Sequence, residues 1–119
     1  MKFKSRREAL IWAAGVYEGE GCLSRLMHKR NYGKKIYHYW QASTVSTDKD
    51  TVETFHSAVG VGRVYYLGEP RGPRGKKVTW TWSCTKREEI YFIMAQIYPF
   101  LCSRRQEKVR EFVKEFSHV

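Results

Sequence analysis

Residues 77–84 constrain the fold more than any other segment of this chain. Bulky apolar residues and small hydroxyl residues take turns at successive positions: Val78, Thr79, Trp80, Thr81, Trp82, Ser83 and Cys84. Because successive side chains of a strand point to opposite faces, this alternation predicts a half-buried strand of an antiparallel sheet. Such a sheet has one apolar face that other elements cover and one polar face that is open to a ligand.

The remaining sequence supplies further strands and four helices. We expect strands at residues 22–28, 36–45, 63–67 and 77–84 and a first helix from about residue 6 to 18. Other helix boundaries are marked by capping residues and breakers: Ser5 with Glu8, Asp48, Gly60, Thr85 with Glu88, Pro99, and Ser103 with Gln106. The order α-β-β-α-β-β-α-α predicts an α+β fold, with one four-stranded antiparallel sheet and the helices on one face. At 119 residues, we expect a single domain over residues 1–119.

The charge balance points to a polyanionic partner. Lys and Arg number 22 and Asp and Glu 12, which gives a net charge of +10, and the pI is near 9.7. DNA, RNA or an anionic membrane surface would match this excess. No apolar run approaches the roughly 20 residues that a membrane span needs, and the basic N-terminus does not read as a secretory signal. We therefore expect an intracellular protein, in the cytoplasm, an organelle matrix or a phage-infected cell, with no membrane partner.

The cysteines do not form a metal-binding pattern. Cys22, Cys84 and Cys102 are widely spaced, and neither they nor the four histidines show the spacing of zinc ligands. We expect three buried, reduced thiols.

The end of the first helix carries two unexpected carboxylates. The segment Ala13-Ala14-Gly15-Val16-Tyr17-Glu18-Gly19-Glu20-Gly21 places Glu18 and Glu20 where the helix dipole disfavours negative charge. Carboxylates and carbonyls gathered there are oxygen ligands that suit a hard cation such as Mg²⁺. The alternative is two solvated glutamates beside a glycine cap.

This segment resembles the signature of the LAGLIDADG homing endonucleases. Ala14, Gly15 and Gly21 match the motif directly, and Glu18 and Glu20 stand where the motif has Asp. The segments 48–65 and 99–104 also look like the family, and the expected element order is the family's α-β-β-α-β-β-α core. The resemblance thus covers nearly the whole chain.

The resemblance implies a catalytic centre with Mg²⁺, for which Mn²⁺ could substitute, and no organic cofactor. Glu20 and the Gly19 carbonyl would hold the metal, and Glu18 would be an ancillary acid. Arg104, or its neighbour Arg105, would stabilise charge at the phosphate. Thr44 and Ser46 would organise water.

The resemblance also implies a homodimer, because the chain has one copy of the motif. Small residues would let two copies of the first helix approach closely, and we expect the seam at Ile11, Trp12, Ala14 and Gly15. The alternative is that alanine and glycine merely fill a buried helix.

The open sheet face is the expected DNA-binding saddle. Strand parity places these residues on it: Ser24, Leu26, His28, Arg30, Lys35, Tyr37, Tyr39, Gln41, Tyr65, Thr79, Thr81 and Ser83. Such side chains suit readout of bases in the major groove, although a slip of one residue would exchange the two faces. Cations at the hairpin tips would bind phosphates: Lys29, Arg30, Lys34 and Lys35 in the first, and Arg71, Arg74, Lys76 and Lys77 in the second.

The sequence therefore predicts a site-specific endonuclease that cuts both strands of a long, pseudo-palindromic duplex, as an intron-encoded homing enzyme does. The alternative is a binder on the same scaffold that does not cleave, either an RNA splicing maturase or a DNA-binding module.

Overall fold

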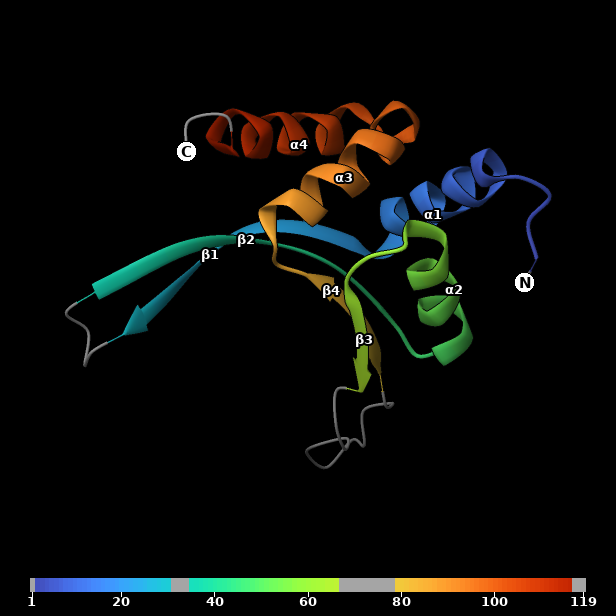
Figure 1. The fold of residues 1–119 in the computed structure, drawn as a ribbon, viewed down its shortest axis with the longest axis horizontal. Helices are drawn as coiled ribbons and strands as arrows, with labels where there is room; N and C mark the ends of the chain where they lie inside the picture. Colours follow the sequence, from blue (N-terminus) through green and yellow to red (C-terminus); the bar gives the residue numbers. More distant parts are fainter. Residues whose placement is uncertain (1, 31–34, 67–78, 117–119) are drawn as a thin grey trace.

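A four-stranded antiparallel sheet in the order β1-β2-β4-β3 organises the molecule, as the computed structural model shows (Figure 1). The structure describes residues 2–30, 35–66 and 79–116. The elements are α1 (Arg6–Glu20), β1 (Gly21–Arg30), β2 (Lys35–Ser46), α2 (Lys49–Val59), β3 (Arg63–Tyr66), β4 (Trp80–Cys84), α3 (Arg87–Ile97), the 3₁₀ turn η1 (Tyr98–Phe100) and α4 (Ser103–Phe116). The α+β fold and the element order predicted from the sequence are confirmed. Leu67 and residues 77–78, expected in strands, lie outside the described residues.

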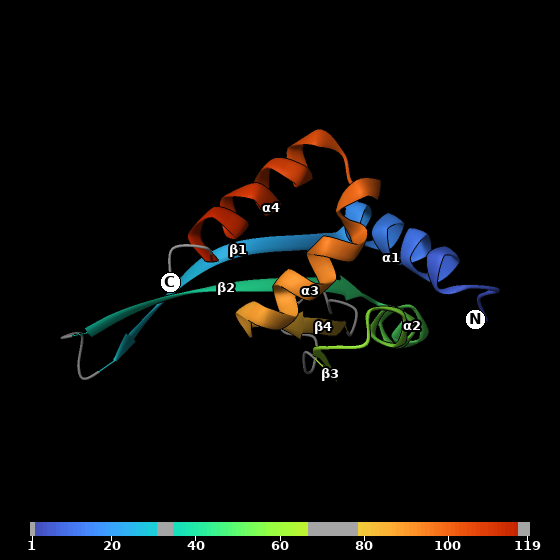
Figure 2. The ribbon, with the colours of Figure 1, turned by 45° about the horizontal axis from the view of Figure 1, so that its top comes forward.

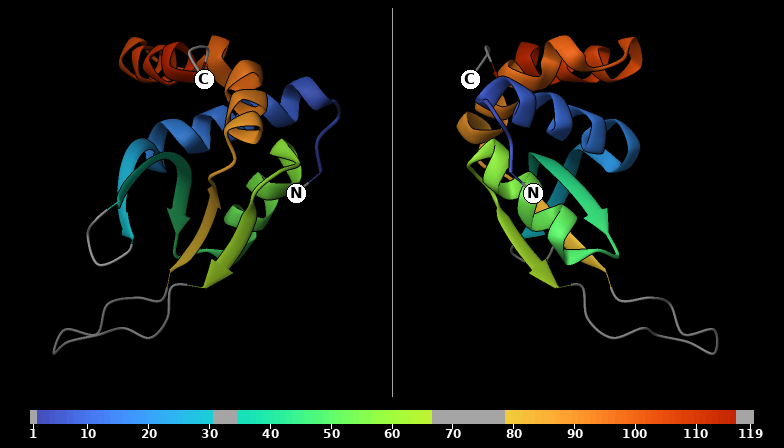
Figure 3. Two further views of the ribbon diagram at one scale, coloured as in Figure 1. Left: turned by 60° about the vertical axis from the view of Figure 1, so that its left-hand side comes forward. Right: turned by 90° about the vertical axis from the view of Figure 1, so that its right-hand side faces the viewer.

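The sheet has one face toward the helices and one open face (Figures 2 and 3). Leu23, Trp40 and Trp82 are buried on the helix side. Their neighbours along each strand point the other way, and the register aligns the open-face residues across the sheet: Ser24 with Gln41, Leu26 with Tyr39, Ser43 with Ser83, and Tyr65 with Thr81. The register is thus the one that strand parity predicted.

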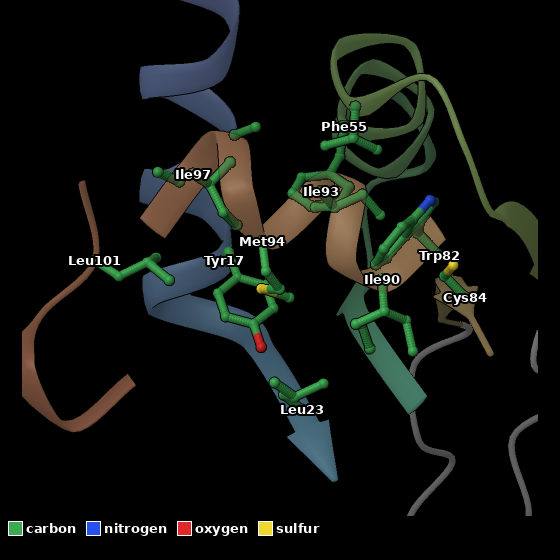
Figure 4. Close-up of a cluster of buried hydrophobic side chains, with 14 of the residues drawn as sticks. Tyr17, Leu23, Phe55, Trp82, Cys84, Ile90, Ile93, Met94, Ile97 and Leu101 are labelled. Carbon is green, nitrogen blue, oxygen red and sulfur yellow. The ribbon is translucent and has the colours of Figure 1, made fainter. Parts of the chain in front are cut away.

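The core fills the space between the helices and the apolar sheet face (Figure 4). Trp82 is fully buried; its ring meets Phe55 edge-on at a centroid distance of 4.8 Å, and its Nε1 donates to the Val61 carbonyl at 2.8 Å. Ile90 and Ile93 of α3 are also fully or almost fully buried. The burial of these large apolar side chains supplies the main driving force for folding.

Two of the predicted helix starts have the expected cap. The Ser5 hydroxyl accepts a hydrogen bond from the Glu8 N–H at 3.1 Å, and the Asp48 carboxylate accepts one from the Asp50 N–H at 3.0 Å. The second helix ends at Gly60, which has a left-handed φ of 82° that glycine adopts without strain.

The other two predicted caps are wrong. The N-cap of α3 is Lys86 rather than Thr85, and it makes no side-chain cap. Ser103 is already the first residue of α4, and the side-chain Nε2 of Gln106 donates to the Tyr98 carbonyl at 2.9 Å. A contact from a distant segment, described below, satisfies the start of α4.

The cysteines also differ from expectation. Cys84 is buried, and this burial, followed by the nearby Glu89 carboxylate, raises the pKa of its thiol to about 12. Cys22 and Cys102 are exposed, so the expectation of three buried thiols is wrong. Cys22 is exposed because it is on the open sheet face, where its Sγ lies 2.8 Å from the Ser24 hydroxyl. None of the described helices is long and apolar enough to cross a membrane.

Candidate catalytic centre and nucleic-acid interface

Helix α1 runs into strand β1 without a connecting loop. Gly21 both caps the helix, through a hydrogen bond from its N–H to the Tyr17 carbonyl, and begins the strand. Its φ of −81° is open to any residue, but a Cβ atom there would collide with the ring and carbonyl oxygen of Tyr17. Glycine is therefore required for close approach, and it sets Glu20 at the point where the helix meets the sheet.

The Glu18 carboxylate is engaged within the chain. Its Oε1 accepts a hydrogen bond from the backbone N–H of Cys102 at 2.6 Å, so it satisfies the residue that precedes α4. Its Oε2 lies 3.6 Å from Nε of Arg105. The hydrogen bond from Cys102 is the main reason that the pKa of Glu18 is lower than usual. These contacts give Glu18 a structural use.

Arg105 closes the C-terminal end of α1. Its guanidinium donates to the carbonyls of Gly21 at 2.7 Å and Glu18 at 2.9 Å, and it lies over the Tyr17 ring at 5.2 Å. These carbonyls belong to the end of a helix, where the last acceptors lack helical partners and a cation is favourable. This use of Arg105 was not predicted from the sequence. The available signal was that the last turn of α1 contains two acids and no base.

Burial around this cluster also affects Tyr17. The ring is almost fully buried between α1 and Arg105, and burial raises the pKa of Tyr17 far above its ordinary value. Its hydroxyl, which is protonated at neutral pH in any tyrosine, therefore stays protonated further into the alkaline range.

Glu20 contrasts with Glu18. It is exposed, and among the described residues it has neither a hydrogen-bond nor an ion-pair partner. Gly19 before it is exposed too, and a Cβ atom there would meet nothing within 4 Å. The described residues contain no group of three or more His, Cys, Asp or Glu side chains that could hold a metal. Mg²⁺, however, is usually bound by one or two carboxylates together with water and substrate phosphates, so one free carboxylate beside helix-end carbonyls fits that ion.

Three cations lie beside the α1–β1 junction. A cavity of about 300 Å³ is lined by Tyr17, Gly21, Cys22, Leu23, Arg104, Arg105 and Lys108. Arg104 is exposed on the first turn of α4, whereas Arg105 is half-buried and already bonded to carbonyls. The structure thus brings Arg104 to the same end of the molecule as Glu20, with its guanidinium available to a phosphate.

The prediction for Thr44 and Ser46 is wrong. Thr44 pairs with Gly21 and Trp82 in the sheet, but its side chain points toward the helices and is only 2% exposed. Even-numbered residues of β2 share the buried face with Trp40, so neither side chain faces the saddle. Parity with Gln41 could have shown this from the sequence. Ser43 is the hydroxyl residue of β2 that faces the open surface.

The open face presents polar and aromatic side chains. The predicted residues of β1 and β2 share this face: Ser24, Leu26, His28, Lys35, Tyr37, Tyr39 and Gln41. Tyr65 joins them from β3, and so does Arg63, whose guanidinium lies 5.5 Å from the centre of the Tyr65 ring. Sequence parity had left Arg63 unassigned.

Some predicted contacts are less accessible than expected, and others cannot be placed. Thr81 and Ser83 are on the open face but only 4% and 7% exposed, because they lie in β4, an inner strand with β2 on one side and β3 on the other. Thr79, just before β4, is half-buried. Arg71, Arg74, Lys76 and Lys77, together with Lys34 and the side chain of Arg30, lie outside the described residues.

The predicted dimer seam is only partly exposed. Ile11 and Gly15 face solvent, and Trp12 is half-buried with its ring 5.5 Å from that of Phe3. Ala14 is only 1% exposed because it packs in its own core, so its expected place at the seam is wrong. A Cβ atom on Gly15 would meet nothing within 4 Å.

Solved structures of DNA complexes share this arrangement of elements. The chain matches I-CeuI, a group I intron-encoded homing endonuclease complexed with DNA, with a TM-score of 0.72 and 15% identity over 96% of this chain and 56% of that one. It matches the homing endonuclease I-CvuI, in complex with its target in the presence of Ca, with a TM-score of 0.68 and 15% identity over 87% and 62% of the two chains. It also matches the LAGLIDADG meganuclease I-CpaMI, bound to uncleaved DNA, with a TM-score of 0.69 and 16% identity over 88% and 34%.

The chain has the fold of the LAGLIDADG homing endonucleases. It spans 56% of the length of I-CeuI and 62% of that of I-CvuI. No protein-family model and no curated protein matches the sequence. In this LAGLIDADG fold, Glu20, Gly19 and Arg104 lie around one junction, at the edge of the open sheet face.

Proposed function

We propose that the protein is a site-specific DNA endonuclease of the LAGLIDADG type that works as a homodimer. The observation that carries this proposal is the state of Glu20. It is an exposed carboxylate without a partner among the described residues, set rigidly where the motif helix meets the polar sheet face. No described residue bonds to it, whereas a metal ion at a phosphate would use it as a ligand.

The open face supports double-stranded DNA as the substrate. It combines Tyr37, Tyr39 and Gln41 with the cations Lys35 and Arg63, on a chain with a net charge of +10. Tyrosine, glutamine and arginine side chains bind phosphates and base edges, and the curved sheet offers them on one continuous surface. The DNA complexes of the structures with this fold support the same partner.

The exposed side of α1 supports a symmetric dimer. Gly15 and Gly19 each reduce helix stability by about 1 kcal/mol relative to alanine. Alanine would fit at both positions, because a Cβ atom would meet nothing within 4 Å. A second copy of α1 packed closely against this side would explain why the positions lack side chains. Two-fold symmetry would then bring one Glu20 from each subunit to a shared centre and would favour a pseudo-palindromic target.

The residues at the α1–β1 junction would have distinct roles in the proposed reaction. Glu20 and the Gly19 carbonyl would hold Mg²⁺, or Mn²⁺ in its place. When bound, such an ion activates water and stabilises the leaving oxygen in phosphodiester hydrolysis. Arg104 would stabilise negative charge on the phosphate. Glu18 would be ancillary, because its carboxylate already holds the start of α4. With DNA as the substrate, the enzyme would act inside a cell or organelle.

Selection of cleaved duplexes from a random DNA library tests the proposal. The wild-type protein, with Mg²⁺ or Mn²⁺, is expected to enrich one long, nearly palindromic sequence, and omission of the metal is expected to abolish enrichment. Glu53→Gln is a matched control, because Glu53 is an exposed carboxylate on α2 whose ion pair among the described residues, with Lys49, is at the surface. If the wild type binds a defined duplex or RNA tightly and never cuts, the binder alternative replaces the enzyme.

A further inference from the structure

The β1–β2 hairpin extends well beyond the rest of the sheet (Figure 1). Its strands pair with each other from Gly21 and Thr44 out to Arg30 and Lys35, but β4 covers β2 only along Ala42–Ser46. Residues 24–30 and 35–41 therefore form a two-stranded ribbon. An isolated ribbon of this kind is only marginally stable in water, so its direction depends on what supports it.

The carboxylate of Glu115 on α4 supports both strands of the ribbon. It accepts hydrogen bonds from Nε of Arg25 at 3.0 Å and from Nε1 of Trp40 at 3.0 Å. Arg25 and Trp40 stand directly opposite each other in the register of β1 and β2. One side chain thus fixes the ribbon to α4 across its full width.

Neighbouring groups complete this contact. The ring of Phe112 meets that of Trp40 edge-on at 5.5 Å, and Nζ of Lys108 lies 5.7 Å from the centre of the Trp40 ring. Nη1 of Arg25 lies 2.8 Å from Nδ1 of His38, which is two pairs further along the ribbon. The hydrogen bonds from Arg25 lower the pKa of Glu115, so this carboxylate keeps its charge to a lower pH than an ordinary glutamate.

Past this cluster, the helix side of the ribbon is open. Met27 and Ile36 are on that side and are 56% and 49% exposed. On the opposite face, Leu26 pairs with Tyr39 beside the cluster and His28 pairs with Tyr37 beyond it. Glu115 is thus at the last place where the described helices hold the strands that carry these side chains.

We infer that Glu115 is a positioning residue. It fixes the direction of the ribbon, residues 24–30 and 35–41, and so determines the preference for the outer base pairs of each half-site. The inference rests on the proposed binding of duplex DNA. A strand rises about 3.3 Å per residue and a duplex about 3.4 Å per base pair, so Leu26, five residues after Gly21, lies about five base pairs from the junction. The expected effect begins there and continues toward the ends of the target.

Because the ion pair is half exposed, its loss is not expected to unfold the protein. The Glu115 carboxylate instead sets the direction of the ribbon relative to α4, because it bonds to both strands at once and a contact at two points fixes an angle. Replacement of Glu115 should therefore change sequence preference more than stability.

The test compares Glu115→Gln with Glu107→Gln on the same helix. Glu107 is exposed and forms no ion pair with the described residues, so its replacement makes the same change in charge without touching the ribbon. Competition binding of single base-pair variants of the selected target, at constant salt, gives the preference at each position. Glu115→Gln is expected to lower discrimination about tenfold beyond the fifth base pair and to leave the inner positions and the melting temperature nearly unchanged. Glu107→Gln is expected to change none of these, and Glu115→Asp to restore part of the preference.

Equal losses at inner and outer positions, or a Glu115→Gln variant that matches Glu107→Gln, would overturn the inference. If the wild type binds no duplex, the proposed function fails, and the role in sequence preference fails with it. Amide hydrogen exchange of the free protein then decides whether Glu115 stabilises the ribbon. Glu115→Gln should speed exchange in residues 24–30 and 35–41 but not in Ala42–Ser46, and unchanged exchange would refute the support.

Discussion

Helix α1 buries Ala13, Ala14 and Tyr17 against the core, whereas Ile11, Gly15 and Gly19 on its other side face solvent. The two carboxylates at the end of α1 differ in the same way, since one makes contacts within the chain and the other faces solvent. Glu18 bonds to the start of α4, and Glu20 bonds to no described residue. On the buried side, intramolecular contacts explain the sequence. On the exposed side, the glycines cost helix stability and Glu20 has no partner among the described residues, so we propose that DNA, metal and a second subunit explain them.

Among substitutions that test this contrast between the two sides of α1, replacement of Glu20 should have the largest effect, and the effect should be on cleavage. Glu20→Gln keeps the size of the side chain but removes the charge proposed to hold the metal, so cleavage should fall about a thousandfold or more. Binding should persist or tighten, because removal of a carboxylate near phosphates relieves repulsion. Single-turnover cleavage and a binding titration on the same duplex measure both.

Glu20→Asp sharpens that result. It restores the charge on a side chain one methylene shorter, so partial activity is expected. A Glu20→Gln variant that cuts at the wild-type rate would show that the metal ligand has been assigned to the wrong residue.

Gly15→Leu should have the next largest effect. The side chain fits the isolated chain, in which a Cβ atom at Gly15 meets nothing within 4 Å, but it would separate two closely packed helices. Light scattering should show the wild type at about twice 14.1 kDa and the variant near 14.1 kDa, with an unchanged circular dichroism spectrum. Gly15→Ala, with one added methyl group, should weaken the dimer less. A wild type that stays at 14.1 kDa across micromolar concentrations would argue against the dimer.

Glu18→Gln tests the buried side and should act on stability. The loss of charge weakens the hydrogen bond from Cys102 and the contact with Arg105, and the expected cost is about 1 kcal/mol, because the site is partly exposed. Urea unfolding, with Glu107→Gln as the control, measures it. Cleavage should fall only as far as the end of α1 loosens. If Glu18→Gln abolishes cleavage without a change in stability, Glu18 is itself a ligand.

The smallest expected effect is in the pH dependence of the difference in unfolding free energy between the wild type and Glu18→Gln. The pKa of Glu18 is lower in the folded protein than in the unfolded chain, so its contribution is fully present above the unfolded value of about 4.3. It is lost as the pH falls through the lower folded value. Unfolding curves of the wild type and Glu18→Gln should therefore differ by a constant amount near neutral pH and converge in acid. Curves that stay parallel down to the acid limit would contradict the charge-based role.

The sequence was most informative where a feature depends on local periodicity. The alternation Trp80, Thr81, Trp82 determined which sheet face is apolar, and the same parity placed Tyr39 and Gln41 on the open face. Asp48 and Ser5 act within their own helices, so their caps were also predictable.

Contacts between distant segments could not be predicted in the same way. Glu18 and Cys102 are 84 positions apart, and only the packed structure shows that one caps the other. Because Glu18 satisfies the start of α4, Ser103 is free to be a helical residue rather than a cap. Ala14 was misplaced because a nearly all-apolar helix does not reveal which side a second subunit would cover. Thr44 differs from these cases, since its parity was available and was overlooked.

The direct α1–β1 junction has a mechanical consequence. With no loop between Glu20 and the first strand, a shift of β1 along the DNA moves the carboxylate by the same distance. The same backbone segment would thus position both base recognition and cleavage, and it would fix the distance from the recognised bases to the scissile bond. If the proposed activity holds, redesign for new targets should keep the backbone from Tyr17 to Leu23 fixed and vary only side chains further out. An insertion at the junction would be expected to leave a protein that still recognises its site and cuts at the wrong bond, or not at all.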